Sequence, residues 1–253
     1  MKAPEKAPEF KKIIQRCNIL PLVTLKNVKI TNYGHSCFSV IAGGKRLLFD
    51  PFISGNELAR NVNIGAVPAD YIFVSHGHFD HMLDVAAIAG RTGALVVGGF
   101  ELYDYFSKQG VKHAHPLNPG GKVTFDFGTA KAVMAQHSSS FQDGTYAGVA
   151  SGFVFKTADG NFYYSGDTAL ALDMKLIPQW AELDFAVFPI GDVLTMGVEE
   201  AIMAAQFVNA DQILGVHYDT FEFIKIKKED AVGEFQKFGL KLHLPAIGDS
   251  FNV

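Results

Sequence analysis

The stretch Ser75-His76-Gly77-His78-Phe79-Asp80-His81 places three imidazoles and one carboxylate within six consecutive residues. Imidazole nitrogens and carboxylate oxygens are donors that Zn²⁺ and similar divalent cations accept. Residues 70–74 (Asp-Tyr-Ile-Phe-Val) read as a short buried strand, and residues 82–89 as the start of a helix. The polar cluster is therefore predicted on the loop that leaves the carboxyl end of a strand, where open α/β layers usually hold their sites.

The spacing within this loop predicts two neighbouring binding points. His76 and His78 are two residues apart, so they point the same way in an extended segment. Asp80 and His81 are adjacent and must diverge as the chain turns into the helix. The chain has 9 histidines in 253 residues, so three of them in six positions favour a metal site over a polar surface loop.

Three further motifs accompany this stretch: Tyr33-Gly34-His35-Ser36-Cys37-Phe38, Phe49-Asp50-Pro51-Phe52 and Thr195-Met196-Gly197. Residues 76–81 resemble the HxHxDH signature of the metallo-β-lactamase superfamily, and the resemblance extends over roughly residues 29–251. The accompanying motifs look like one branch, the small bacterial metal-dependent hydrolases related to L-ascorbate 6-phosphate lactonase. The resemblance implies an α+β fold, the four-layer αβ/βα sandwich, with metals at one edge between two sheets.

Three more candidate ligands each stand at the end of a stretch that predicts a strand: His137, Asp167 and His217. Gly166 permits the tight turn that would bring Asp167 inwards. The match to the family's Gly-Asp-Thr element implies that Asp167 touches both metals. His137 and His217 resemble the family's third histidine and its final ligand.

The resemblance thus implies two metal positions that share one acid. The expected ligands are His76, His78 and His137 at the first position, Asp80, His81 and His217 at the second, and Asp167 between them. All of these side chains bind through nitrogen or oxygen, and no thiolate is among them. One or two divalent ions are therefore expected, with Zn²⁺, Mn²⁺ and Fe²⁺ all compatible.

This ligand set predicts a metal-dependent hydrolase. A water between two such cations loses its proton near neutral pH, and the resulting metal-bound hydroxide would cleave an ester, lactone or phosphodiester bond of a small molecule. Asp80 and Asp167 are the expected catalytic carboxylates, and Asp80 would steer the proton of the attacking water. The alternative is a non-catalytic metal-binding or scaffold protein of the same fold, which turnover that disappears on chelation would exclude.

Five further residues lie in segments that the resemblance places near the metals: His35, Asp50, Asp84, Asp192 and Asp219. His35 is either a turn residue or a contact of the substrate or of a ligand. Asp50 is either a turn residue or the acceptor for a ligating imidazole. Asp84 either accepts a proton from a ligand imidazole or caps the helix, and Asp219 either contacts substrate or forms a turn. Asp192 stands where members of the branch often carry Gly, and this departure is expected to alter substrate choice.

Apolar patterns predict the remaining elements. Strands are expected at residues 28–33, 38–42, 45–50, 93–99, 122–128, 129–136, 161–168, 184–191 and 212–216, with a last edge strand at 240–244, and helices at 101–108, 198–208 and 227–238. Residues 56–69 are expected to form an irregular loop that makes one wall of the site. His113 and His115 are interpreted as structural, because proline follows at once. The two halves suggest a pseudo-repeat.

The composition bounds the remaining expectations. The hydrophobic content of 48% is ample for a core, and a net charge of −4 argues against a nucleic-acid surface. Two cysteines are too few for a disulfide framework and fit a reducing cytoplasm. No apolar run is long enough for a membrane span. Residues 1–26 are expected to be an extension, with helical turns at 10–16 that would suit a homo-oligomer, and residues 27–253 a single domain.

Overall fold

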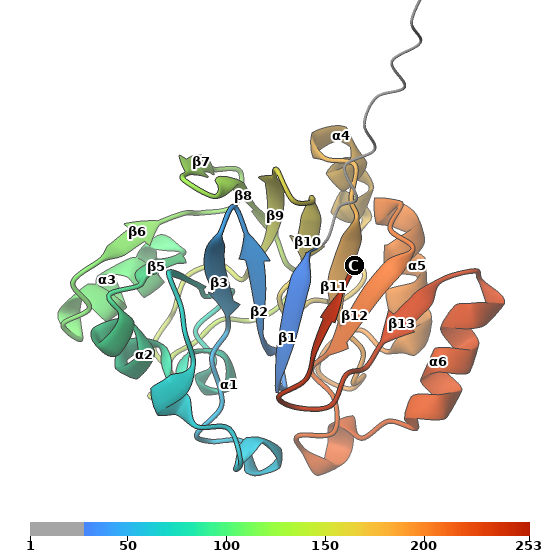
Figure 1. Cartoon of the computed structure of the whole chain (residues 1–253), viewed down its shortest axis with the longest axis horizontal. Helices are drawn as coiled ribbons and strands as arrows, with labels where there is room; N and C mark the ends of the chain where they lie inside the picture. The colour runs from blue at the N-terminus through green and yellow to red at the C-terminus, as the bar shows by residue number, and fades with distance from the viewer. Residues whose placement is uncertain (1–27) are drawn as a thin grey trace, which may run out of the picture.

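The structure, a computed structural model, describes residues 28–253 and contains two seven-stranded mixed sheets (Figure 1). The first sheet has the order β14-β1-β2-β3-β4-β5-β6 and the second β13-β12-β11-β10-β9-β8-β7. The strands of the first sheet are β1 (Lys29–Gly34), β2 (Cys37–Ala42), β3 (Lys45–Phe49), β4 (Tyr71–Phe73), β5 (Leu95–Gly98), β6 (Ala114–Pro116) and β14 (Ser250–Asn252). Those of the second are β7 (Lys122–Phe125), β8 (Gly128–Met134), β9 (Ser151–Thr157), β10 (Phe162–Tyr164), β11 (Phe185–Pro189), β12 (Gln212–Val216) and β13 (Lys241–His243).

The two sheets repeat one pattern of strand directions. In the first sheet β14, β1, β2 and β3 pair antiparallel, and β3 to β6 pair parallel. In the second sheet β7 to β10 pair antiparallel, and β10 to β13 pair parallel. This pattern agrees with the predicted pseudo-repeat. As a consequence β1, β3 and β4 end at one edge of the first sheet, and β8, β10 and β12 end at one edge of the second.

Helices cover the outer face of each sheet, and the inner faces pack on each other (Figure 1). Strand β4 shows how the period of two builds these layers. Tyr71 and Phe73 belong to the core between the sheets, whereas Ile72 and Val74 belong to the core beneath the first helices. The helices are α1 (Phe79–Met82), α2 (Val85–Thr92) and α3 (Phe100–Lys108) on the first sheet, and α4 (Ile177–Trp180), α5 (Val198–Val208) and α6 (Lys228–Lys237) on the second. This order of layers is the predicted α+β four-layer sandwich.

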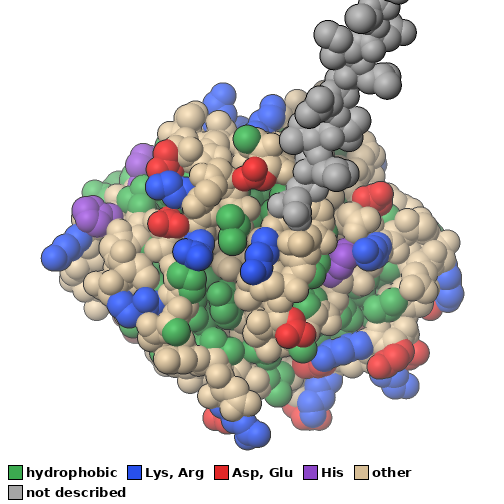
Figure 2. All heavy atoms as spheres, viewed as in Figure 1, with side chains coloured by type: hydrophobic (Ala, Val, Ile, Leu, Met, Phe, Trp, Pro, Cys, Tyr) green, Lys and Arg blue, Asp and Glu red, His purple; other side chains and the backbone are tan. Residues whose placement is uncertain are grey.

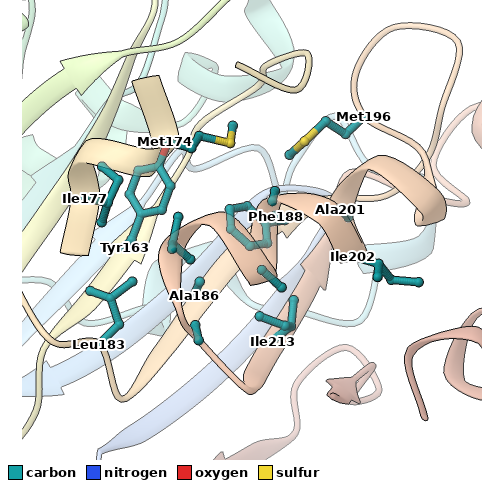
Figure 3. Packing of buried hydrophobic residues seen from close by; sticks show 14 of the residues in the cluster. Tyr163, Met174, Ile177, Leu183, Ala186, Phe188, Met196, Ala201, Ile202 and Ile213 are labelled. Atoms are coloured by element: carbon teal, nitrogen blue, oxygen red, sulfur yellow. The ribbon is translucent and has the colours of Figure 1, made fainter. Parts of the chain in front are cut away.

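Helix α5 packs closely on the second sheet because its inner face is small. Ala201, Ala204 and Ala205 are fully buried. Figure 3 shows Ala201 of this helix above Phe188 of β11 and Ile213 of β12, within one cluster of buried residues. The close contact of helix and sheet supports the loop before α5, which reaches the edge where the strands end.

Some elements differ from the sequence-based prediction. Strands β9 and β14 and the segment with α4 were not predicted. The edge strand predicted at residues 240–244 is present as β13, at one edge of the second sheet, but it is not the last strand, because β14 follows it and pairs with β1. The helix expected at 82–89 is interrupted between α1 and α2. Residues 56–69 contain two short 3-10 turns, η1 (Glu57–Ala59) and η2 (Ile64–Ala66).

The core between the sheets contains residues from Val28 to Val216, drawn from both halves of the chain. This shared core supports a single domain over residues 27–253, which stays a prediction. The expected extension, residues 1–26, lies outside the described residues. Among residues 28–253, no helix combines the length and the apolar character that crossing a membrane requires.

Candidate metal centre

The strand ends of both sheets meet at one edge of the sandwich. The first sheet contributes the residues that follow β1, β3 and β4: His35, Asp50 and residues 75–81. The second contributes those that follow β8, β10 and β12: His137, Asp167 and His217. A backbone hydrogen bond of 3.0 Å from the His217 N–H to the His35 carbonyl joins the two sets. Strand direction therefore assembles segments that are far apart in the sequence.

Three histidine rings form the first cluster, His76, His78 and His137, with one nitrogen of each within 4.8 Å of the others. His76 Nε2 lies 2.9 Å from His78 Nδ1. The ring centroid of His137 lies 5.0 Å from that of His76 and 5.1 Å from that of His78. Two nitrogens bound to one tetrahedral Zn²⁺ are about 3.3 Å apart, so this spacing suits a shared cation.

Asp80, His81 and His217 belong to a second cluster, which also includes His35 and whose contributing atoms likewise lie within 4.8 Å of one another. Asp167 lies between the two clusters. Its Oδ2 is 3.1 Å from His81 Nε2 and 2.9 Å from His217 Nε2. The same oxygen is 3.8 Å from His137 Nε2, on the side of the first cluster. One buried carboxylate thus reaches both groups of side chains, as the sequence predicts for a bridging acid.

Asp50 orients two of the histidines. Its fully buried carboxylate accepts hydrogen bonds from His81 Nδ1 at 2.8 Å and from the Tyr164 hydroxyl at 2.6 Å. It also accepts the backbone N–H of Ser75 at 2.7 Å and the Ser75 hydroxyl, whose oxygen is 2.9 Å from His76 Nδ1. A proton on Nδ1 of each ring leaves Nε2 facing the centre. The hydrogen bond to His81 is the contact that the acceptor interpretation of Asp50 requires.

The backbone around the centre is held in unusual conformations. His35, Asp50 and His217 have left-handed φ values of 54°, 39° and 56°. Such residues cost on the order of 1–3 kcal/mol each and gather at functional sites. Gly166, at φ +62°, takes this conformation without that cost, and a Cβ there would lie 2.6 Å from the Ser151 carbonyl oxygen. The glycine therefore turns the next side chain inwards, as predicted.

The pKa values of the buried carboxylate and imidazole groups in the centre depend on one another. Burial would raise the pKa of Asp167, but His217 and His81 hold it well below its usual value. Burial would lower the pKa of His81, but the carboxylates of Asp167 and Asp50 raise it well above its usual value. Burial lowers the pKa of His76, so this ring is neutral and offers a lone pair.

Within the described residues, three buried atoms of the centre make no hydrogen bond of good geometry: Asp167 Oδ1, His217 Nδ1 and His81 Nε2, the last of which lies 3.1 Å from Asp167 Oδ2. Buried polar atoms normally have one, so each such exception calls for a missing partner. Asp167 Oδ1 offers a lone pair to a divalent cation, and so does His81 Nε2 once its ring gives up one proton; the two atoms lie beside two clusters of imidazole nitrogens. The residues present therefore fit a bound metal.

His35 is a contact of a candidate ligand. Its Nε2 lies 3.0 Å from Asp80 Oδ2, and its Nδ1 lies 3.0 Å from the Thr220 hydroxyl. Burial and the neighbouring His217 lower the pKa of His35 to about 4, so the ring is neutral. A neutral ring that donates to Asp80 accepts at the other nitrogen from Thr220. Of the two interpretations that the sequence leaves open, the contact with a ligand is the one that the structure shows.

Asp84 stands at the N-cap position of α2, in line with one of the two roles predicted for it, but its side chain bonds elsewhere. Its carboxylate accepts the backbone N–H groups of Ile53 at 2.6 Å and Ser54 at 2.9 Å, and also the Ser54 hydroxyl. The side chain makes no capping hydrogen bond to α2, and these hydrogen bonds include no imidazole. The predicted contact with a ligand imidazole is absent from these hydrogen bonds, because the helix breaks between α1 and α2 and the i,i+3 relation to His81 is lost.

Asp192 and Asp219 form turns beside the centre, with left-handed φ values of 62° and 65°. The Asp192 carboxylate accepts the N–H of Val193 at 2.7 Å. Asp219 accepts the N–H of Ile226 at 3.1 Å and pairs with Lys228 at 3.1 Å, so the turn interpretation describes it. Aspartate tolerates this backbone conformation, which glycine favours.

His113 and His115 lie away from the centre. Within the described residues they belong to none of the clusters that could hold a cation. Nδ1 of His115 is 2.8 Å from the Pro116 carbonyl oxygen, and its ring packs edge-on against Phe125 with centroids 5.9 Å apart. These contacts are those of a structural residue, as the sequence predicts.

A cleft of about 510 Å³ opens onto the centre. Five candidate ligands line it: His78, Asp80, His137, Asp167 and His217. An aromatic and aliphatic wall is formed by Phe79, Phe141, Leu194, Phe221 and Phe223, and the remaining polar residues are Ser138, Ser140 and Gln142. Asp192 and Asp219 are absent from this lining, so the expected effect of Asp192 on substrate choice has no contact with the cleft to support it.

Residues 56–69 do not line the cleft either, and the prediction that they form a wall was wrong. Ala59 and Val67 pack instead in the core beneath the first helices. Sequence reasoning also missed Ser75 and Tyr164, the partners of Asp50, and the apolar wall of the cleft. The available signal was weak: a serine before the first histidine, and aromatic residues within otherwise polar loops.

Comparison with known proteins identifies a family for this chain. The family described as "Beta-lactamase superfamily domain" matches residues 29–217. The chain belongs to the metallo-β-lactamase superfamily. Among its superfamily relatives, a "UPF0173 metal-dependent hydrolase" of Flavobacterium johnsoniae is 48% identical over 226 residues, which cover 89% of this chain and 100% of that protein. Another of that description, from Christiangramia forsetii, is 46% identical over 227 residues, with 89% and 100% covered.

Solved structures share the fold of this chain. Igni18, a metallo hydrolase from Ignicoccus hospitalis, is 28% identical and matches with a TM-score of 0.81, covering 90% of this chain and 98% of that one. An isothiocyanate hydrolase from Delia radicum gut bacteria, 19% identical, matches with a TM-score of 0.69 over 88% and 98% of the two chains, which shows the fold alone. The predicted superfamily and four-layer fold are confirmed, and this superfamily member is a metal-dependent hydrolase. Its relation to L-ascorbate 6-phosphate lactonase stays a prediction.

Proposed function

We propose that this chain hydrolyses an ester, lactone or phosphodiester bond of a small molecule at a centre with two cation positions. The observation that carries the proposal is the convergence of nitrogen and oxygen donors from both sheets around the buried Asp167, whose Oδ1 has no partner. The proposed ligands are His76, His78 and His137 at one position, Asp80, His81 and His217 at the other, and Asp167 between them. Such donors suit Zn²⁺, Mn²⁺ or Fe²⁺, as one ion or two.

The residues of the chain have distinct parts in this reaction. A bound cation supplies acidity to a water molecule and polarises the bond that is cleaved. Asp80 takes a proton from the attacking water and returns it to the leaving oxygen. Burial would raise the pKa of Asp80, but the hydrogen bond from His35 and the charge of His81 lower it, so the carboxylate stays ionised. The water oxygen ends on the acyl carbon, and the alcohol leaves with a proton.

The charges of the cleft favour a carboxylic ester or lactone over a phosphodiester. No lysine or arginine is among the residues that line it. Recognition of phosphate groups relies on such cations, because they form short, charge-assisted hydrogen bonds with its oxygens. The lining instead carries two carboxylates, Asp80 and Asp167. An uncharged substrate meets no repulsion from them.

The proposal includes a small-molecule substrate and no nucleic-acid partner. Figure 2 shows acidic and basic side chains interspersed over the face in view, without a broad basic surface there. Recognition of nucleic acid calls for basic residues gathered on one face. A cytoplasmic location also belongs to the proposal, and the buried free thiol of Cys37 supports it. A homo-oligomer stays a prediction.

Metal content per chain, measured by mass spectrometry on protein purified without chelator, tests this function. We expect about two equivalents in the parent and a clear loss in Asp167→Ala, because the bridging acid is gone. The control is Asp219→Asn, which changes a carboxylate outside the cleft and should keep the parent's metal. Near one equivalent would favour a single-ion centre.

Turnover completes the test. Hydrolysis of p-nitrophenyl acetate should disappear on chelation and return when metal is restored. A chain that binds no metal after refilling with Zn²⁺ or Mn²⁺ would refute the proposed centre. A chain that holds metal but turns over no ester, lactone or phosphodiester would instead support the non-catalytic alternative.

A further inference from the structure

An apolar pocket adjoins the cleft of the candidate centre. It has a volume of about 210 Å³ and lies between α1, α2 and α3. Its lining consists of Phe79, Met82, Leu83, Ala86, Tyr105, Phe106, Gln109 and Gln142. Phe79 and Gln142 line the cleft as well. The pocket and the cleft therefore share a border, and a molecule bound at the centre can extend into the pocket.

An aromatic wall runs from the cleft into the pocket. Phe141 lines the cleft, Tyr105 lines the pocket, and their rings are stacked with centroids 4.3 Å apart and planes at 17°. On the other side, Phe79 packs edge-on against the buried Phe52 with centroids 5.5 Å apart. These partners hold the rings in place, so the apolar passage between them is part of the fold.

Two large apolar side chains at this border are exposed to solvent, although apolar groups are more stable when they are buried. Phe79 is 44% exposed and the neighbouring Leu83 is 47% exposed. None of the described residues that line the pocket is charged, and the polar groups of its lining, the Tyr105 hydroxyl and the amides of Gln109 and Gln142, are neutral. Covering this surface with an apolar group would remove it from water, and the free energy gained grows with the apolar area buried.

We propose that the substrate carries an apolar acyl chain, which occupies this pocket while the bond to be cleaved lies at the metal centre. This inference rests on the proposed function and adds the substrate class: an uncharged ester or lactone of a medium-chain carboxylic acid. Continuity of the pocket with the cleft identifies the occupant as part of the substrate. The chain would pass from the centre into the pocket between Phe79 and Gln142, which line both.

A series of p-nitrophenyl esters of acetate, butyrate, hexanoate and octanoate tests the length of the chain. Each added methylene that enters an apolar pocket should raise kcat/KM by about fourfold. Ala86→Trp places a large ring in the pocket and should lower the ratio of kcat/KM for octanoate to that for acetate by at least about tenfold. Ala87→Trp is the matched control, because Ala87 is an exposed neighbour on α2 that does not line the pocket.

A binding measurement separates this inference from the proposed function. N-phenyl-1-naphthylamine, a neutral apolar dye, should bind to the metal-loaded protein, and octanoate ester should displace it. Ala86→Trp should weaken dye binding about tenfold, while Ala87→Trp leaves it unchanged.

Each outcome decides between the two claims. If the protein hydrolyses no ester but Ala86→Trp still weakens dye binding, the proposed reaction is refuted and the pocket remains a binding site for apolar molecules. Equal kcat/KM for acetate and octanoate would overturn the inference, and so would equal dye binding in the two tryptophan variants. A dimer that only Ala86→Trp dissociates, without any effect on dye affinity, would assign the pocket to contact between copies and would also overturn it.

Discussion

Replacing Asp50 by asparagine tests whether the hydrogen bonds that orient His81 and His76 control metal binding. The carboxylate accepts hydrogen bonds from His81, from Tyr164 and from both the N–H and the hydroxyl of Ser75, and it is 0% exposed. Hydrogen bonds to a charged group contribute about 1.5–3 kcal/mol each. Three of these hydrogen bonds end on Oδ2, and the one from the Ser75 N–H ends on Oδ1. Asparagine replaces one of the two oxygens by a donor that faces donors, so one or three of the bonds are lost, and those that remain no longer involve a charge. We expect the free energy of unfolding to fall by about 3–5 kcal/mol.

Metal affinity should fall as well. Without the carboxylate, His81 and His76 lose the partners that direct Nε2 at the centre. Changes to such partners typically lower metal affinity by about 10–100-fold. Denaturant unfolding in excess chelator measures the first effect without the contribution of bound metal. Competition with a chromophoric chelator measures the second.

Asp84→Asn is the matched control. Asp84 is 3% exposed and accepts three hydrogen bonds from Ile53 and Ser54, none of which involves an imidazole. This variant should lose stability to a similar degree and keep the parent's metal affinity. Equal metal affinity in the Asp50 and Asp84 variants, whether lowered or not, would refute the reasoning, because it would show that orientation of the histidines has no influence on binding.

Gly166→Ala places a Cβ 2.6 Å from the Ser151 carbonyl oxygen at φ +62°. We expect the free energy of unfolding to fall by about 1–3 kcal/mol in denaturant titrations and the bound metal to decrease in metal analysis. Stability and metal content equal to those of the parent would contradict this. Burial and a nearby lysine lower the pKa of His243 to about 4. The unfolded chain therefore takes up the proton first as pH falls below about 6.5, and stability is lost towards about pH 4. His243→Gln should remove this part of the pH dependence, which urea titrations at about pH 4.5 and about pH 7 measure. His35→Ala removes the ring nitrogen 3.0 Å from Asp80; kcat at saturating metal should fall about 10–100-fold, and an unchanged kcat would show that His35 is a turn residue only.

Local patterns in the sequence predicted much of this molecule. Residues 198–208 and 212–216 form a helix and a strand with the expected bounds, because their apolar periodicity continues over several turns or pleats. Elements with a weaker local signal were missed. Strand β14 has three residues and is mostly exposed, so its place depends on pairing with β1.

The candidate ligands were predictable for a related reason. His76, His78, Asp80 and His81 lie on one loop, so their spacing alone indicates a metal site. His137, Asp167 and His217 required the resemblance to a known family, since a lone polar residue after a strand is usually structural. The structure brings all seven side chains together, and their role as ligands stays a proposal.

The sequence by itself therefore determined the layered α+β fold, the loop that carries the histidines and the donor chemistry of the centre. The tertiary structure alone decided which distant residues meet. Tyr164 reaches Asp50 across 114 positions and Thr220 reaches His35 across 185. The apolar pocket likewise joins α1 and α2 to residues 105–109 and 142. Local sequence sets backbone conformation and the direction of each side chain, whereas contacts at such separations exist only once two sheets have packed on a shared core.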